Sequence, residues 1–159
     1  MFSRLLKTPN DGTLTILRLV LGFVFLAHGA QKVLGWYGGP GFSGTMGMFQ
    51  SMGIPPFFAF LAIAAEFLGG LGLILGFLGR IAAFGIMCNM AVAVLIVHLN
   101  KGLFMNWTGN QTGEGFEYHL LALAIGFTLL IRGSGALSID YVISHPRTTR
   151  VQGFGERAA

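Results

Sequence analysis

Residues 55–78 read PPFFAFLAIAAEFLGGLGLILGFL and contain a single ionisable side chain, Glu66. Crossing the hydrocarbon core of a bilayer takes about 20 predominantly apolar helical residues, and this stretch is long enough to do so. It lacks the strict alternation of apolar and polar residues that marks the strands of a membrane barrel. The stretch therefore predicts a membrane-spanning helix with a carboxyl group midway along it.

Three more apolar segments accompany this one, at residues 13–34, 80–98 and 116–131. The first two are long enough to cross a bilayer, whereas the last is short and must recruit flanking residues or lie where the bilayer is thin. Gly79 is the only clear break between two of the spans, which predicts a tight antiparallel hairpin. We expect an all-α fold, an integral membrane four-helix bundle.

The composition supports a lipid environment. Hydrophobic residues make up 53% of the chain and charged residues 10%, against about 25% charged residues in soluble domains. The net charge of +4 comes from basic residues that flank the apolar runs, so it does not indicate nucleic-acid binding. We expect one domain at residues 1–145 and a polar, disordered tail at residues 146–159.

The basic residues also predict an orientation. Lys32 and Lys101 lie on one side of the predicted topology, and the larger group shares the other side: Arg4, Lys7, Arg80, Arg132, Arg147, Arg150 and Arg157. Because basic residues are enriched in cytoplasmic loops, this bias predicts that both termini are cytoplasmic. Trp36 and Trp107 then lie at the outer interface, where aromatic side chains concentrate. After the last span, Ser138 is suited to cap a short interfacial helix.

Glu66 needs an explanation, since a charged group inside hydrocarbon costs about 2.5–3.5 kcal/mol on insertion scales. By helical rise it lies roughly 16 Å from the outer end of its span. Arg18, His28 and Lys32 form one stripe on the first span, and either Arg18 or His28 could approach Glu66 if the two spans pack together. Asn89, at the depth of Glu66, could donate a hydrogen bond to it. Two roles for Glu66 are equally open: it belongs to a functional site, or it forms a pair that only fixes helix packing.

A second polar cluster is expected at the outer ends of three spans: His28, Gln31, Lys32, His98, Glu117, Tyr118 and His119. Imidazole and carboxylate groups can bind zinc or iron, and the same side chains can hydrogen-bond the carbonyls of a quinone. None of their spacings is a metal signature. We therefore predict no metal site and no intrinsic cofactor.

Several short motifs together resemble the DoxX family. They are Arg18-Leu19, His28-Gly29-Ala30-Gln31-Lys32, Gly35-Trp36-Tyr37-Gly38-Gly39-Pro40-Gly41, Met52-Gly53-Ile54-Pro55, Ala65-Glu66-Phe67-Leu68-Gly69-Gly70, Gly79-Arg80, Glu117-Tyr118 and Ser138-Ile139-Asp140. The resemblance covers roughly residues 13–143. It implies a small four-helix protein of the bacterial inner (plasma) membrane, of a family that includes membrane subunits of quinol- and thiosulfate:quinone-oxidising systems and members associated with thiol-based oxidative-stress systems.

The resemblance places the candidate site on the matched polar positions. Glu66 and His28 are candidates for handling protons, and the other candidates would bind a ligand: Arg18, Gln31, Lys32, Asn89, His98, Glu117, Tyr118 and His119. The chain has no Cys-x-x-Cys motif and no flavin, nicotinamide or haem fingerprint. Electron transfer would therefore need a redox-protein partner.

Three functional hypotheses remain open. The first is a quinone-linked membrane subunit of an oxidoreductase, with quinone near Glu66. The second is a non-catalytic assembly subunit that docks a partner. The third is a small-solute transporter, which would require a homodimer because four short helices leave little room for alternating access.

Overall fold

The computed structural model describes residues 2–146, and every regular element in that range is helical, which confirms the all-α prediction. The predicted tail, apart from residue 146, lies outside the described residues. The elements are α1 (Phe2–Leu6), α2 (Gly12–Leu34), η1 (Trp36–Gly38), α3 (Gly41–Ser51), α4 (Pro56–Leu75), α5 (Gly79–Ala93), η2 (Val94–His98), η3 (Leu99–Lys101), α6 (Glu117–Arg132) and α7 (Ile139–Ser144).

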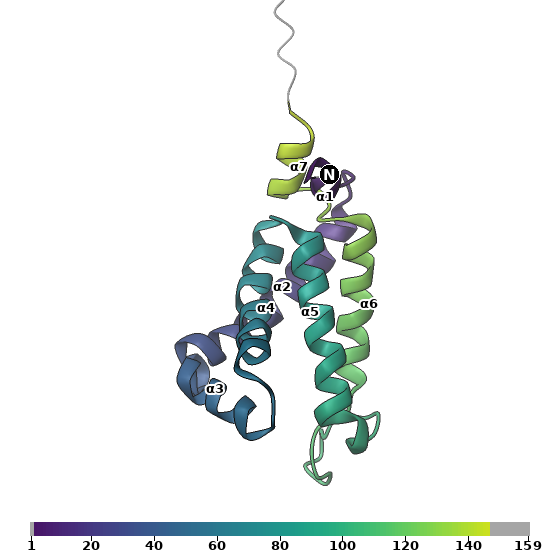
Figure 1. The fold of residues 1–159 in the computed structure, drawn as a ribbon. Coiled ribbons are helices and arrows are strands. Elements are labelled where there is room, and N and C mark those ends of the chain that lie inside the picture. The colour runs from purple at the N-terminus through teal and green to yellow at the C-terminus, as the bar shows by residue number, and fades with distance from the viewer. Residues whose placement is uncertain (1, 147–159) are drawn as a thin grey trace, which may run out of the picture.

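The four long helices α2, α4, α5 and α6 run side by side (Figure 1), and α6 packs back against α2. Three helical stretches are long and apolar enough to cross a membrane: Gly12–Leu34, Pro56–Leu75 and Gly79–Lys101. With 16 residues, α6 is shorter than the roughly 20 residues that a crossing takes. A fourth span therefore stays a prediction, as does the orientation in the membrane.

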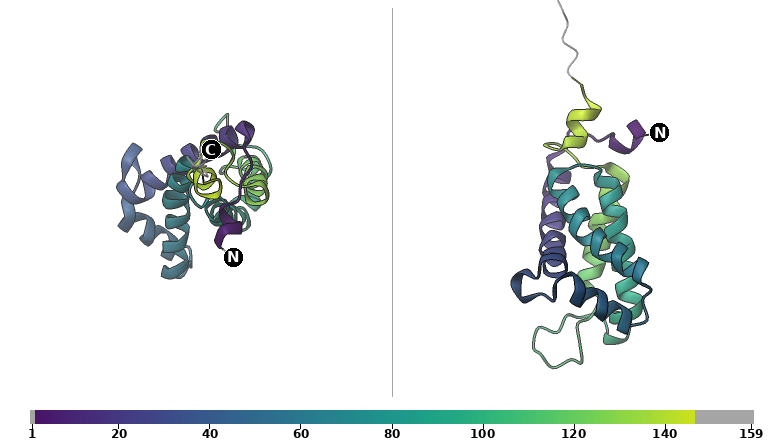
Figure 2. Two further views of the ribbon diagram at one scale, coloured as in Figure 1. Left: turned by 90° about the horizontal axis from the view of Figure 1, so that it is seen from above. Right: turned by 60° about the vertical axis from the view of Figure 1, so that its left-hand side comes forward.

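The two ends of the bundle carry different elements. The N-terminus, α1, α7 and the turn between α4 and α5 gather at one end (Figure 1), which we call the terminal end. The opposite end, called the loop end, carries α3 and residues 102–116. Figure 2, seen from above, shows α3 beside the bundle, where it contacts α2 and α4. Helix α3 was not predicted, because its glycines and low hydropathy are not typical of a helix.

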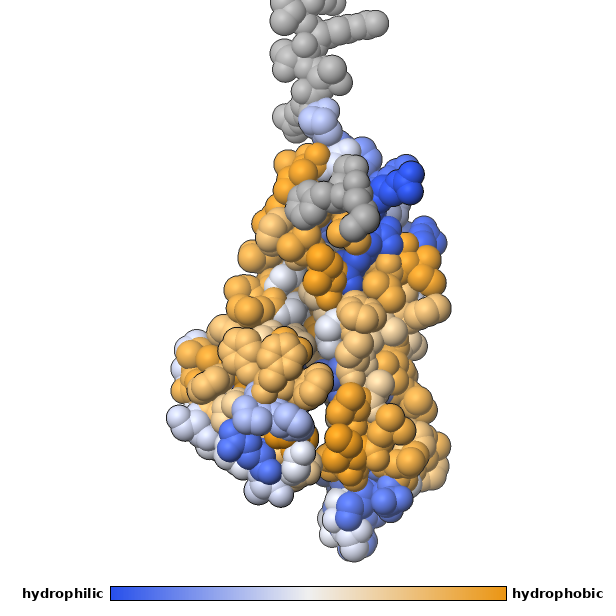
Figure 3. All heavy atoms as spheres, in the orientation of Figure 1, coloured by the Kyte–Doolittle hydropathy of each residue, from blue (hydrophilic) through white to orange (hydrophobic). Residues whose placement is uncertain are grey.

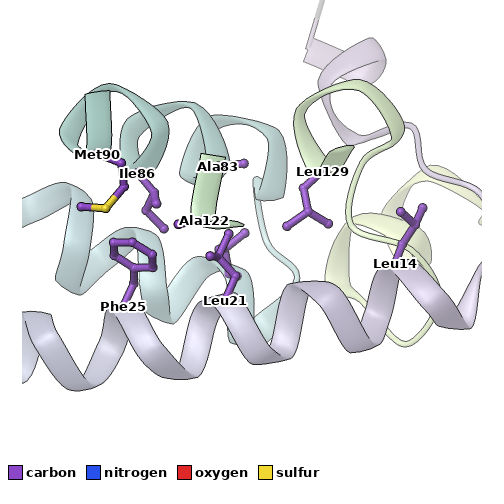
Figure 4. Packing of buried hydrophobic residues seen from close by; sticks show 9 residues of the cluster. Leu14, Leu21, Phe25, Ala83, Ile86, Met90, Ala122 and Leu129 are labelled. Carbon is purple, nitrogen blue, oxygen red and sulfur yellow. The ribbon is translucent and has the colours of Figure 1, made fainter. Parts of the chain in front are cut away.

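The interior of the bundle is apolar. Side chains from the four long helices meet in it (Figure 4): Leu14, Leu21, Phe25, Leu73, Ala83, Ile86, Met90, Ala122 and Leu129. Large apolar side chains also cover the outside, and Figure 3 shows them along the flanks with hydrophilic residues towards the two ends. A helical protein that is apolar inside and outside is adapted to lipid.

Glycine lets α2 and α4 approach to backbone contact. A Cβ atom on Gly29 would lie 2.5 Å from Cα of Phe67, and one on Gly70 would lie 2.8 Å from Cα of Leu26. Small residues allow such close approach of helices in membranes. The contacts also fix the register, which sets Glu66 beside Gly29.

Two arginines cap helices at the terminal end. The Arg18 guanidinium donates to the carbonyls of Leu73 and Ile74 at the C-terminal end of α4. Arg80 donates to the carbonyls of Leu130 and Ile131 at the C-terminal end of α6. The last carbonyls of a helix have no partner within the helix and carry partial negative charge, so cations stabilise them.

Asp140 fastens α7 to the turn between α4 and α5. Its carboxylate accepts hydrogen bonds from the backbone N–H groups of Leu78, at 2.8 Å, and Gly79, at 3.0 Å. The Ser134 hydroxyl donates to it at 2.6 Å, and the side chain is 1% exposed. A carboxylate at the N-terminal end of α5 both satisfies free N–H groups and suits the helix dipole.

Candidate functional site

A buried polar triad forms where α2, α4 and α5 meet. Glu66 is 5% exposed, and its Oε2 atom forms an ion pair with Nζ of Lys32. The Asn89 side chain donates to the other oxygen, Oε1, at 2.8 Å, as expected from its depth. Both oxygens of the carboxylate therefore have partners, which is how a charged group is tolerated away from water.

The depth of Glu66 depends on which helix is used to measure it. Counted along α4, it lies about 15 Å from the start at Pro56, close to the predicted value. Counted along α2, however, it is level with Gly29, only about 8 Å from the end of that helix at Leu34. The two counts differ because α4 begins beyond the end of α2. Lys32, one turn past Gly29, can therefore extend to Glu66.

Arg18 does not approach Glu66, so that expectation is wrong. Besides capping α4, its guanidinium donates to the carbonyls of Ser134, at 3.0 Å, and Leu137, at 3.1 Å. The side chain is 1% exposed. With its donors used on backbone carbonyls at the terminal end, Arg18 fixes the fold there.

Beside the triad, three rings gather between α2 and α6. The ring of Tyr118 lies 6.4 Å from that of Phe25 and 6.3 Å from that of His28, centroid to centroid. His28 is exposed and its Nδ1 atom bonds the Val24 carbonyl at 2.9 Å, so His28 does not pair with Glu66. We call Phe25, His28 and Tyr118 the aromatic group.

The hydroxyl of Tyr118 is buried and has no hydrogen-bond partner among the described residues. His28, whose ring lies against that of Tyr118, is one helical turn from Lys32 on α2, so the aromatic group lies next to the triad. Burying a hydroxyl without a partner costs free energy. The aromatic group therefore offers an unused hydrogen-bond donor beside the triad.

The other candidates lie in three separate places at the loop end. The rings of His98 and His119 are 4.1 Å apart, and the His98 Nδ1 atom contacts the Glu114 carbonyl at 2.8 Å. Glu117 instead holds the loop, since Oε1 accepts from the indole N–H of Trp107 at 3.1 Å. Gln31, half-buried on α2, packs its backbone against Gly39. The residues of the predicted outer cluster therefore do not form one site. Lys32 belongs to the triad, His28 and Tyr118 to the aromatic group, and the others lie in the three places just described.

Within residues 2–146, no group of three or more His, Cys, Asp or Glu side chains is placed to hold a metal ion. Sequence reasoning missed Phe25, because an apolar ring within an apolar span gives no sign that it lies against Tyr118. It also missed structural residues at the terminal end. Ser138 caps α7 as expected, its hydroxyl accepting from the N–H of Tyr141 at 3.1 Å. Asp140, two residues further on, gave no signal of its contact with α5 beyond its place in the Ser138-Ile139-Asp140 motif.

Together, the apolar helices and the buried polar triad define a helical integral membrane protein. The model of one known protein family, DoxX, matches residues 13–99 of the chain. The chain belongs to the DoxX family.

Three relatives are similar over most of their length. "Putative oxidoreductase CatD" of Bacillus subtilis is 34% identical, over 84% of this chain and 88% of the relative. "Inner membrane protein YqjF" of Escherichia coli is 29% identical, over 87% and 98%. "Uncharacterized membrane protein Rv3486" of Mycobacterium tuberculosis is 30% identical, over 91% and 90%. No solved structure matches the chain.

Proposed function

We propose that this protein is the membrane subunit of a redox system and binds a quinone between the buried triad and the aromatic group. The observation that carries the proposal is the buried Tyr118 hydroxyl without a partner. A quinone carbonyl would accept its hydrogen bond, and the rings of Phe25 and His28 would contact the head group. The name of the Bacillus subtilis relative, "Putative oxidoreductase CatD", agrees with a redox role.

Glu66 would act through its charge, because both of its oxygens already have partners. The negative charge of its carboxylate, held in place by Lys32 and Asn89, would stabilise protonated forms of a ligand bound beside Tyr118. Oxidation of a quinol releases two electrons and two protons. His28, exposed at the edge of the site, would take up the two protons one after the other and pass each to solvent, and we assign both electrons to a partner protein.

The test measures quinone bound to the purified protein. Lipid extraction and mass spectrometry of the wild type should give a quinone at a reproducible molar ratio. Tyr118→Phe removes one hydrogen bond and leaves the ring, which should weaken binding about tenfold. Tyr141→Phe, on α7 at the terminal end, makes the same change away from the site and should retain the quinone. Absence of quinone from the wild type, or equal retention in Tyr118→Phe, would overturn the proposal.

A second candidate function, a non-catalytic assembly subunit, is favoured by the complete pairing of Glu66. In that case the triad only fixes the packing of three helices. A stoichiometric partner should then co-purify, Tyr118→Phe should leave the activity of that partner unchanged, and Glu66→Gln should act only by reducing the amount of folded protein.

A further inference from the structure

An apolar groove lies at the terminal end, beside α7 and far from the aromatic group. Its volume is about 460 Å³, and it lies between the end of α4 and the segment that enters α7. The lining is mostly apolar: Asn10, Leu75, Ala136, Leu137, Ser138, Ile139, Tyr141 and Val142.

Leu137, in the wall of this groove, is held in a strained and exposed position. Its φ angle is +50°, a left-handed conformation that costs a side-chain-bearing residue roughly 1–2 kcal/mol. The side chain is 88% exposed, so packing within the described protein does not offset that cost. The Arg18 guanidinium holds the carbonyl of Leu137 at 3.1 Å. The backbone is therefore fixed in a conformation that points a leucine out of the protein.

The groove continues the lipid-facing side of α4. Leu68, Leu71 and Leu75 are 61%, 39% and 48% exposed, and their spacing places them on one face of the helix, which leads to the groove. On α7, Val142 is 70% exposed. Since α4 lies in a bilayer, the surface that extends it is in contact with the same lipid.

The charge around the terminal end is positive. Arg4 and Lys7 are exposed, and Arg132 is partly free because its nearest carboxylate oxygen, on Asp11, is 3.7 Å away. Among residues 2–146, the other acidic residue at this end is Asp140, which is buried and accepts hydrogen bonds at the start of α5. Basic residues next to a membrane surface attract anionic lipid, each by about 1 kcal/mol.

We propose that the groove beside α7 binds an acyl chain of an anionic phospholipid, with Leu137 inserted into the leaflet at the terminal end. The acyl chain lies along Leu75 and Val142, and its phosphate lies among the basic residues at this end. The lipid comes from the surrounding bilayer, which supplies a partner for the otherwise uncovered Leu137.

The depth of Leu137 is directly measurable. Cys88 is the only cysteine in the chain, so Cys88→Ala provides a background in which Leu137→Cys can carry a nitroxide label in nanodiscs. We expect the label to be as accessible to oxygen, and as protected from a water-soluble nickel complex, as one at Leu68→Cys. A label at Thr108→Cys, exposed in the loop at the other end, should show the reverse. A label at 137 that behaves like the one at 108 would overturn the proposal.

Lipid selectivity is tested with nanodiscs that mix phosphatidylcholine and phosphatidylglycerol. Native mass spectrometry of the released protein should show phosphatidylglycerol retained over phosphatidylcholine. Leu137→Asn keeps a residue that tolerates the left-handed conformation but removes the apolar side chain, which should reduce retention about tenfold. Leu103→Asn, at the loop end, should leave retention unchanged. Equal retention of the two lipids, or full retention by Leu137→Asn, would contradict the proposal. The quinone measurement is independent of both outcomes.

Discussion

The loss of stability on breaking the ion pair between Lys32 and Glu66 should depend strongly on which of the two residues is replaced. Lys32→Met leaves a carboxylate that is 6% exposed and has only Asn89 as a partner among the residues that the structure describes. Removing one partner of a buried pair costs about 3–5 kcal/mol, and we expect about 3 kcal/mol because the Lys32 side chain is 20% exposed. Glu66→Gln should cost only about 1 kcal/mol, since glutamine keeps the bond from Asn89 and the flexible lysine can extend towards water.

The double variant distinguishes a real pair from two independent effects. With both charges absent, Lys32→Met/Glu66→Gln should be more stable than Lys32→Met alone, with a coupling energy of about 2 kcal/mol. Thermal unfolding in detergent, followed by circular dichroism, measures this, because 1 kcal/mol shifts the Tm of a chain of this size by about 2–4 °C. Lys32→Met should lose about 6–12 °C and Glu66→Gln about 2–4 °C. Additive losses, or equal losses in the two single variants, would refute the reasoning.

Two further substitutions test the packing and the terminal end by the same thermal assay. Gly29→Ala should destabilise the protein by about 1–3 kcal/mol because its Cβ atom would lie 2.5 Å from Cα of Phe67. As a control, Gly47→Ala, with open space around it, should change stability by less than about 0.5 kcal/mol. Equal effects would count against backbone contact between α2 and α4. Asp140→Ala should cost about 2 kcal/mol by removing the acceptor for two N–H groups at the start of α5. An unchanged Tm would show that α7 does not fasten this turn.

Hydropathy was sufficient to predict where the long helices lie in the chain. Residues 13–34 became Gly12–Leu34 and residues 55–78 became Pro56–Leu75, because an apolar run of that length has few other stable conformations in lipid. The hairpin at Gly79 was also correct. Hydropathy does not predict how far one helix is shifted along its neighbour. For α2 and α4, the contact of Gly29 with Phe67 decides that shift.

That shift explains which parts of the candidate site were predictable. Asn89 was expected beside Glu66 because the two lie at the same depth. That estimate was correct because α4 and α5 are joined by a tight turn that fixes their register. The partner on α2 was expected to be Arg18 or His28, since depth was counted from Cα positions with the helix ends taken as level. The long side chain of Lys32 and the early start of α4 together bring the ammonium group to the carboxylate instead.

The glycine contacts have a consequence for how a ligand enters the bundle. Because the backbones of α2 and α4 touch at Gly29 and Gly70, these helices cannot part without losing packing along their shared length. A hydrophobic ligand of the proposed kind would therefore enter on the other side of α2, where Phe25 and His28 meet Tyr118. Substitutions along that route should change the rate of ligand exchange, whereas substitutions at the glycines should change the folding equilibrium.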